Sequence, residues 1–175
     1  MPEINILPKH VAELIAAGEV VERPSSVVKE LVENAIDAGS TRIVVEIKGG
    51  GISMLRVTDN GCGILKSEIP NAFLRHSTSK ITDEADLLKL HTLGFRGEAL
   101  SSIVAVAHVE CMTKTADSLV GARYVPKTDG SGELSEIGVP DGTTFVIRDL
   151  FYNTPARLKF LKSSKTEGGY IQEVL

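Results

Sequence analysis

Residues 29–37 read Lys-Glu-Leu-Val-Glu-Asn-Ala-Ile-Asp, so acids and an amide interrupt a strongly apolar helical pattern. A helix turns by about 100° per residue, and at that spacing aliphatic side chains fill one half of its circumference and polar side chains the other half. Spacings of four and three residues bring Glu30, Asn34 and Asp37 onto one narrow stripe beside the apolar half. We therefore expect a core helix with a polar rim, and we interpret the remaining chain as its setting.

Glu30 and Asn34 suit a catalytic centre that holds a hard cation. A half-buried carboxylate one turn from an amide oxygen can act as a general base beside Mg²⁺, which prefers oxygen ligands and keeps several of its waters. Glu33 points further round the helix toward Lys29, where a solvated ion pair is expected. The alternative is an ordinary amphipathic helix with polar residues at its rim, and this segment alone leaves both interpretations open.

Asp59 is the next candidate residue, at the end of a strand predicted over residues 52–59. Strict alternation places it on the same face as Leu55 and Val57, where an unpaired charge would be costly. The turn that follows, Asn-Gly-Cys-Gly, brings bare backbone close to whatever Asp59 binds. An ionised carboxylate only accepts hydrogen bonds, so it would bind the amino group of adenine and disfavour the carbonyl of guanine. The alternative, an aspartate that satisfies the amides of its own turn, is equally open.

A glycine-rich segment from Gly94 to Leu100, Gly-Phe-Arg-Gly-Glu-Ala-Leu, opens a helix that is expected to continue through Val106. Free amides at such a helix start suit phosphate, although a lone glycine-rich turn is weak evidence. The segment gains weight as the third element that a bound nucleotide would need, after the helix with Glu30 and the strand that ends at Asp59.

The composition is that of one soluble globular domain. Of 175 residues, 42% are hydrophobic and 24% are charged, which excludes disorder and fibre as the main class. Cys62 and Cys111 form no disulfide framework or metal-ligand spacing, and no leader or apolar run of about 18 residues is present, so we expect a reducing, cytoplasmic setting. A net charge of −4 argues against this segment acting alone as a strong DNA binder, because affinity for phosphate backbones comes mainly from lysine and arginine.

Strands dominate the second half of the chain. The pattern predicts strands at residues 43–48, 104–111, 119–125 and 143–147, with a turn at 129–132. Thr154 and Pro155 then suit the cap and the first turn of a C-terminal helix.

Taken together, these elements resemble the MutL family of DNA mismatch repair proteins over essentially the whole chain. Six motifs carry the resemblance, namely residues 30–38, 59–63, 75–80, 94–100, 142–144 and 149–157. The first, second and fourth are also similar to the wider GHKL group of ATPases, which includes DNA gyrase B, the large heat-shock chaperones and sensor histidine kinases. The motifs at residues 75–80, 94–100 and 149–157 narrow the resemblance to MutL-like proteins.

The resemblance implies an α/β sandwich, the GHKL or Bergerat ATP-binding fold, in which a mixed β-sheet carries helices on one face. ATP would lie between sheet and helices under a flexible lid. Residues 1–150 would form the ATPase domain, including the N-terminal arm. Residues 151–175 would be a connecting helical segment that leads to a second subdomain absent from this chain.

The family motifs also imply a role for each candidate residue. Glu30 would be the general base for the attacking water, Asn34 the Mg²⁺ ligand and Asp59 the adenine reader. The other residues implied to contact ATP are Gly61 and Gly63 in the turn, Thr143 near the adenine, Thr78, Ser79 and Lys80 in the lid, and Gly94, Arg96, Gly97, Glu98, Ala99 and Leu100 around the triphosphate.

By resemblance, the chain would be a Mg-dependent ATPase that works as a nucleotide-driven dimerisation switch and couples mismatch recognition to nuclease action. The implied partners are ATP, a second copy in the full-length protein, a MutS-like mismatch sensor and a nuclease, with DNA bound through the full-length dimer and no membrane. The family's second subdomain supplies a lysine to the γ-phosphate, and losing such a group can cost about a hundredfold or more in rate, so we expect weak binding and slow hydrolysis from this chain.

Two other interpretations belong to different classes of protein. In a binding module, nucleotide would be only a structural ligand and the output would be protein contact. In a histidine kinase catalytic domain, phosphate would pass to a histidine on a neighbouring domain. The MutL-type motifs disfavour the kinase.

Overall fold

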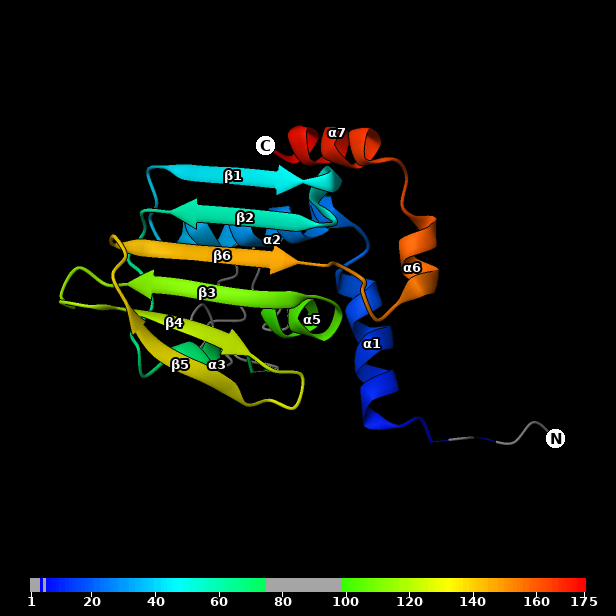
Figure 1. Ribbon diagram of the computed structural model, residues 1–175, viewed down its shortest axis with the longest axis horizontal. Helices are drawn as coiled ribbons and strands as arrows, with labels where there is room; N and C mark the ends of the chain where they lie inside the picture. The colour runs from blue at the N-terminus through cyan, green and yellow to red at the C-terminus, as the bar shows by residue number, and fades with distance from the viewer. Residues whose placement is uncertain (1–3, 5, 75–98) are drawn as a thin grey trace, which may run out of the picture.

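The computed structural model describes residues 4, 6–74 and 99–175, which build one six-stranded sheet with the strand order β1-β2-β6-β3-β4-β5 (Figure 1). The strands are β1 (Ile43–Lys48), β2 (Met54–Asp59), β3 (His108–Lys114), β4 (Gly121–Pro126), β5 (Gly132–Ile137) and β6 (Gly142–Arg148). The described helices are α1 (Lys9–Val20), α2 (Pro24–Asp37), α3 (Ile69–Ala72), α5 (Ala99–Val106), α6 (Pro155–Phe160) and α7 (Ser164–Val174), with a short 3₁₀ turn η1 (Gly49–Gly51). The predicted α/β class is confirmed.

The strand pairing differs from the mixed sheet that the family resemblance implied. All pairings between the described strands are antiparallel. β2 and β3 run in the same direction, as a helical crossover between them requires, but β6 enters between them and pairs with both. The last strand in the sequence therefore lies near the centre of the sheet.

One face of the sheet is covered by helices and forms the core. In Figure 1, α2, α3 and α5 lie behind the sheet, and the face toward the viewer carries none of the described helices. The central core side chains on the covered face are Leu55, Val57, Val109, Cys111, Phe145 and Ile147, all 5% exposed or less. They alternate with side chains that point to the open face, because successive residues of a strand face opposite sides. Most of these are polar, among them Arg56, Glu110 and Arg148, but Val146 is apolar and 4% exposed.

Helix α2 is the core helix that the sequence predicted. Val27, Val28, Leu31 and Ala35 are at most 1% exposed. Burial of the two valines and the leucine stabilises the fold by about 1.5–3 kcal/mol each. Pro24 occupies its first turn, where the missing amide proton costs nothing.

The open face carries ion pairs across its strands. Arg56 lies 3.6 Å from Glu46, and Glu110 accepts from Arg123 at 2.6 Å and from Arg148 at 3.3 Å. The hydrogen bond from the Arg123 guanidinium holds the pKa of Glu110 below its ordinary value of 4.5, although burial acts in the opposite direction.

The structure corrects two predictions for the second half of the chain, a strand that was missed and a strand that begins later than predicted. β5 was missed, because most of its side chains are exposed and no apolar alternation marks it. The strand predicted to begin at residue 104 begins at His108, because α5 continues through Val106. A short apolar run does not distinguish a strand from a buried helix, and here the helix prevails.

The segment after β6 folds back onto the body of the molecule. Asp149 and Phe151 have positive φ values of 54° and 65°, an uncommon conformation for residues with side chains. The turn is held by a hydrogen bond from the Phe151 amide to the Val106 carbonyl at 2.7 Å and from the Leu150 amide to the Ile52 carbonyl at 3.0 Å. α7 then packs against η1 and α2. The domain boundary at residue 150 stays a prediction.

Within the described residues, no helix has the length and apolar character needed to cross a membrane.

Candidate nucleotide site

The buried carboxylate of Asp59 is the centre of the candidate site. It ends β2 on the covered face and is 9% exposed. Its Oδ1 accepts from the Gly61 amide at 2.8 Å and from the Thr143 amide at 3.3 Å. Oδ1 thus accepts from an amide of the turn that follows Asp59, as one interpretation of the sequence predicted. The hydrogen bonds made by Asp59 within the described residues use Oδ1 alone, so Oδ2 keeps its capacity to accept from a ligand.

Thr143 lies beside Asp59 because β6 enters the sheet next to β2. The two residues are register partners, and Thr143 is 7% exposed. The approach is so close at Gly142 that a side chain there would collide with the Asp59 carbonyl, and its φ of 115° also favours glycine. The sequence implied a place for Thr143 near Asp59 only through the family motif.

Gly61 and Gly63 allow the turn after β2 to pack closely against the end of α2 and the end of β3. A Cβ at Gly61 would lie 2.7 Å from the Ala38 Cβ, and one at Gly63 would collide with the Lys114 carbonyl. The Cys62 amide donates to the Ala38 carbonyl at 3.0 Å, which ties the turn to the end of α2. The glycines therefore have a packing role, and their contact with ATP stays a prediction.

The candidate residues of α2 lie on its partly covered side. Glu30 and Asn34 are intermediate in burial, and Asp37 is exposed. Glu33 is only 9% exposed, so the predicted solvated pair with Lys29 is wrong. The helical pattern assumed that only the sheet covers α2, whereas α2 also contacts α7 and η1.

The protein oxygens of this side can serve a cation that is held mainly by phosphate. Mg²⁺ bound to a nucleotide takes one or two oxygens from the protein and the rest from phosphate and water. The amide oxygen of Asn34, one turn from the Glu30 carboxylate, fits that donor set. Among the described residues no group of three or more histidine, cysteine, aspartate or glutamate side chains could hold a metal.

Most of the predicted lid and phosphate residues lie outside the described part of the chain. These are Thr78, Ser79, Lys80, Gly94, Arg96, Gly97 and Glu98. Ala99 and Leu100 form the first residues of α5, and Leu100 packs against the hydrophobic core. The phosphate-binding roles of all these residues stay predictions.

The sequence analysis missed Thr113, which is 1% exposed and pairs with Thr143 on the side of β6 away from Asp59. Its Oγ1 lies 2.9 Å from the Ile64 amide, 3.0 Å from the Gly142 carbonyl and 2.9 Å from the Thr143 hydroxyl. The alternation of Val109, Cys111 and Thr113 along β3 could have revealed it, because it places a hydroxyl on an apolar face. Burial, with the nearby Asp59 charge, raises the pKa of the Cys111 thiol.

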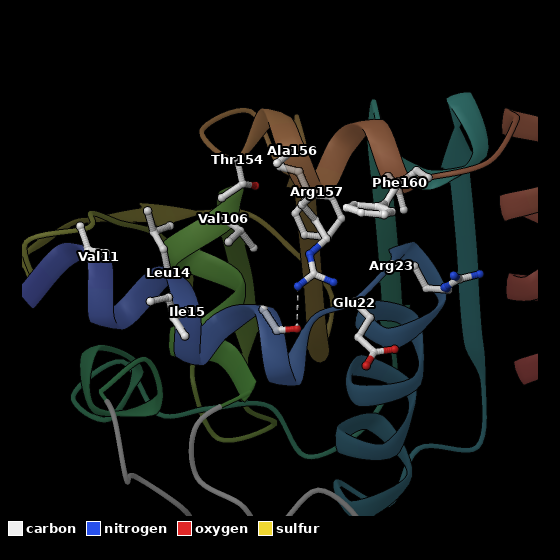
Figure 2. Close-up of a pocket in the computed structure, with 13 residues that line it drawn as sticks. Val11, Leu14, Ile15, Glu22, Arg23, Val106, Thr154, Ala156, Arg157 and Phe160 are labelled. Carbon is white, nitrogen blue, oxygen red and sulfur yellow. Dashed lines mark hydrogen bonds between the residues drawn. The ribbon is translucent and has the colours of Figure 1, made fainter. Parts of the chain in front are cut away.

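A separate hollow of about 820 Å³ lies between α1, α5 and α6 (Figure 2). Its lining is mainly apolar and includes Leu14, Phe151 and Phe160. Arg157 reaches toward α1 and donates to the Gly18 carbonyl at 3.2 Å. None of the described candidate residues lines this hollow, so it is distinct from the site around Asp59.

Known proteins are similar to this chain in sequence and in fold. Residues 22–130 match the family model described as histidine kinase-, DNA gyrase B-, and HSP90-like ATPase. A DNA mismatch repair protein MutL from Agathobacter rectalis is 66% identical over 100% of this chain and 27% of its own length. A protein of the same name from Citrifermentans bemidjiense is 51% identical over 99% of this chain and 27% of its own length. The chain thus spans about a quarter of the length of the curated relatives it matches.

Solved structures with a similar fold also come from DNA repair proteins. The N-terminal domain of a DNA repair protein superposes with a TM-score of 0.75 at 32% identity, covering 97% of this chain and 48% of that one. The MutL ATPase domain of Aquifex aeolicus complexed with ADP superposes with a TM-score of 0.66 at 33% identity, covering 89% of this chain and 54% of that one. The chain therefore belongs to the family of histidine kinase-, DNA gyrase B- and HSP90-like ATPases, and the resemblance to MutL predicted from its motifs is confirmed.

Proposed function

We propose that this chain binds and hydrolyses ATP as the N-terminal ATPase region of a MutL-like DNA mismatch repair protein. The observation that supports this most is the state of Asp59, a buried carboxylate whose Oδ1 is held by two amides while Oδ2 keeps its capacity to accept. Oδ2 accepts a hydrogen bond from the amino group of adenine in the proposed complex, which favours ATP over GTP. The ADP bound to the related ATPase domain from Aquifex aeolicus supports the class of ligand.

The proposed reaction takes place at the rim of α2. Glu30 accepts a proton from a water as the oxygen of that water bonds to the γ-phosphorus, and the bond from that phosphorus to the bridging oxygen breaks, which leaves ADP and phosphate. Asn34 offers its amide oxygen to Mg²⁺, which when bound neutralises charge on the phosphate oxygens. Thr78, Ser79, Lys80 and the segment from Gly94 to Leu100 enclose the triphosphate in this proposal.

In the full-length protein, ATP binding drives dimerisation, and hydrolysis reverses it. The exposed apolar side chains of the N-terminal arm support such a surface, since Ile4 is 98%, Ile6 97% and Leu7 51% exposed. The dimer, in the cytoplasm, couples a MutS-like mismatch sensor to a nuclease and contacts DNA. The family's second subdomain supplies a lysine to the γ-phosphate, so hydrolysis by this chain alone is slow.

Two substitutions separate binding from chemistry. Glu30→Ala is expected to keep ATP affinity and to lose hydrolysis by about a hundredfold or more, because a positioned general base contributes that much. Asp59→Ala is expected to lose binding. Lys29→Ala, an exposed position on the same helix, is the control and should match the wild type. Titration calorimetry and phosphate release measure the two quantities, and equal ATPase activity in all four proteins would refute the assignment.

Dimerisation has its own test. Light scattering after gel filtration should show a larger mass for the full-length protein with a non-hydrolysable ATP analogue than without it. An unchanged mass at a saturating analogue concentration would contradict the switch and leave the ATPase proposal standing.

A further inference from the structure

The buried hydroxyl of Thr113 joins β3 to two other segments, the stretch after β2 and the start of β6. Its three contacts, at 2.9–3.0 Å, are the Ile64 amide from the segment after β2, the Gly142 carbonyl at the start of β6 and the Thr143 hydroxyl. Thr113 is 1% exposed and Thr143 is 7% exposed, so water does not compete freely for these groups. Thr113 is not among the residues that the motifs or the proposed mechanism assign to the nucleotide.

The three contacts fix the direction of the protons. A hydroxyl has one proton to donate and two lone pairs to accept with. The Ile64 amide can only donate to Thr113, and the Gly142 carbonyl can only accept from it. Thr113 therefore gives its proton to Gly142 and uses one lone pair for Ile64. The contact with Thr143 is satisfied when the Thr143 hydroxyl donates to the second lone pair of Thr113. The proton of Thr143 is then used inside the protein.

We propose that Thr113 is a positioning residue for base recognition, which acts by orienting the Thr143 hydroxyl so that it presents only lone pairs to a bound purine. The inference rests on the proposed function. With its proton directed to Thr113, Thr143 adds a second acceptor to the Asp59 Oδ2. The amino group of adenine has two protons to offer, whereas guanine has a carbonyl oxygen at the same ring position, which two acceptors repel. Thr113 thus increases the preference for ATP over GTP without contacting either nucleotide.

The test compares ATP and GTP affinities in Thr113 variants of the full chain. Thr113→Val keeps the shape of the side chain and removes the hydroxyl, which releases the Thr143 proton. The ratio of ATP to GTP affinity is expected to fall about tenfold, the loss typical of one hydrogen bond. Thr113→Ser restores the hydroxyl and is expected to keep the wild-type ratio. Calorimetric titration with each magnesium nucleotide measures both affinities, and thermal unfolding verifies that each variant is folded.

Thr144→Val is the matched control. Thr144 follows Thr143 directly but faces the open side of the sheet, where its hydroxyl lies 3.3 Å from that of Thr58. Removing it deletes a hydroxyl from the same strand, and the nucleotide ratio is expected to stay at the wild-type value. Should Thr113→Val not fold, Thr113→Cys takes its place, because a thiol is a weak donor and acceptor.

The outcomes separate this inference from the proposed function. A wild-type protein that binds neither nucleotide, or both equally, overturns the proposed base recognition. If the wild type prefers ATP and the folded Val or Cys variant keeps the same ratio, Thr113 has no positioning role, although the site stands. An equal fall in the Ser and Val variants also overturns the inference, because the hydroxyl would then not be the group responsible.

Discussion

Two carboxylates on opposite faces of the same sheet, Asp59 and Glu110, are held in different ways. Both oxygens of Glu110 are taken by cations, Oε1 by Arg123 at 2.6 Å and Oε2 by Arg148 at 3.3 Å. Oδ1 of Asp59 is held by two backbone amides instead, and Oδ2 accepts nothing from the described residues. The Glu110 pairs complete an open surface, whereas Asp59 keeps an oriented acceptor in a buried place. Partner type and remaining acceptor capacity therefore distinguish Asp59, the proposed binding carboxylate, from Glu110, which has the same ionisable group.

The largest expected effect on ATP affinity comes from substituting the two carboxylates in the same way. Asp59→Asn keeps the shape but replaces one acceptor oxygen with a donor, and ATP affinity is expected to fall about a hundredfold, as for loss of a charge-assisted hydrogen bond and its replacement by a mismatch. Glu110→Gln makes the same chemical change on the open face and should leave affinity unchanged. Titration calorimetry on both variants gives the comparison. Similar losses in both would mean that the two carboxylates do not differ in function.

The next prediction concerns stability, at the contact that holds Asp59 beside Thr143. Gly142→Ala places a Cβ against the Asp59 carbonyl at a φ of 115°, and the three nearest atoms are all backbone atoms of Asp59 and Asn60, so the free energy of unfolding is expected to fall by about 3 kcal/mol or more. Gly130→Ala is the control, because its φ is 89° but no heavy atom lies within 4 Å of the added Cβ. It should cost only about 1–2 kcal/mol, which isolates the effect of φ. Equal losses in urea unfolding would show that β6 yields at Gly142.

The smallest effect is the pH dependence of the open face. The pKa of Glu110 is lowered from 4.5 in the folded protein, so its ion pairs contribute stability above the unfolded pKa, and that contribution is lost as the pH falls through the folded pKa. Because both arginines are partly solvated, the contribution is about 1 kcal/mol or less. Urea unfolding at pH 7 and at pH 3 should show a slightly larger loss for the wild type than for Glu110→Gln. A larger loss in the variant would reverse the sign of the effect.

The sequence predicted the parts of the site that depend on local pattern. The helix with Glu30 and Asn34 and the strand ending at Asp59 follow from periods of 3.6 and 2, which are properties of neighbouring residues. The place of β6 between β2 and β3 could not be derived this way, because the register of Asp59 with Thr143 joins residues 84 positions apart. Alternation along β3 could have revealed Thr113 as a buried hydroxyl, but its partners Ile64 and Thr143 required the fold.

Burial of a charged group was also beyond local pattern. Glu33 occupies the polar half of α2 by spacing, yet it is buried, and α2 contacts α7 and η1, which are distant in the sequence, as well as the sheet. The family resemblance placed Thr143 near the adenine, and the structure pairs it with Asp59, the predicted adenine reader. The contact of Thr143 with adenine stays a prediction. Periodicity thus identified the two elements that carry Glu30, Asn34 and Asp59, and the partners of those residues required the fold.

The central position of β6 affects the order in which the surroundings of Asp59 can form. On a ribosome, β2 and β3 emerge before the strand that must join them, so a nascent chain that ends before Gly142 holds a carboxylate at the end of β2 without the Thr143 amide it needs. Pairings between distant segments form late, since their loop entropy must be overcome first. In the proposed function, nucleotide binding at Asp59 therefore requires that β6 has already paired with β2 and β3.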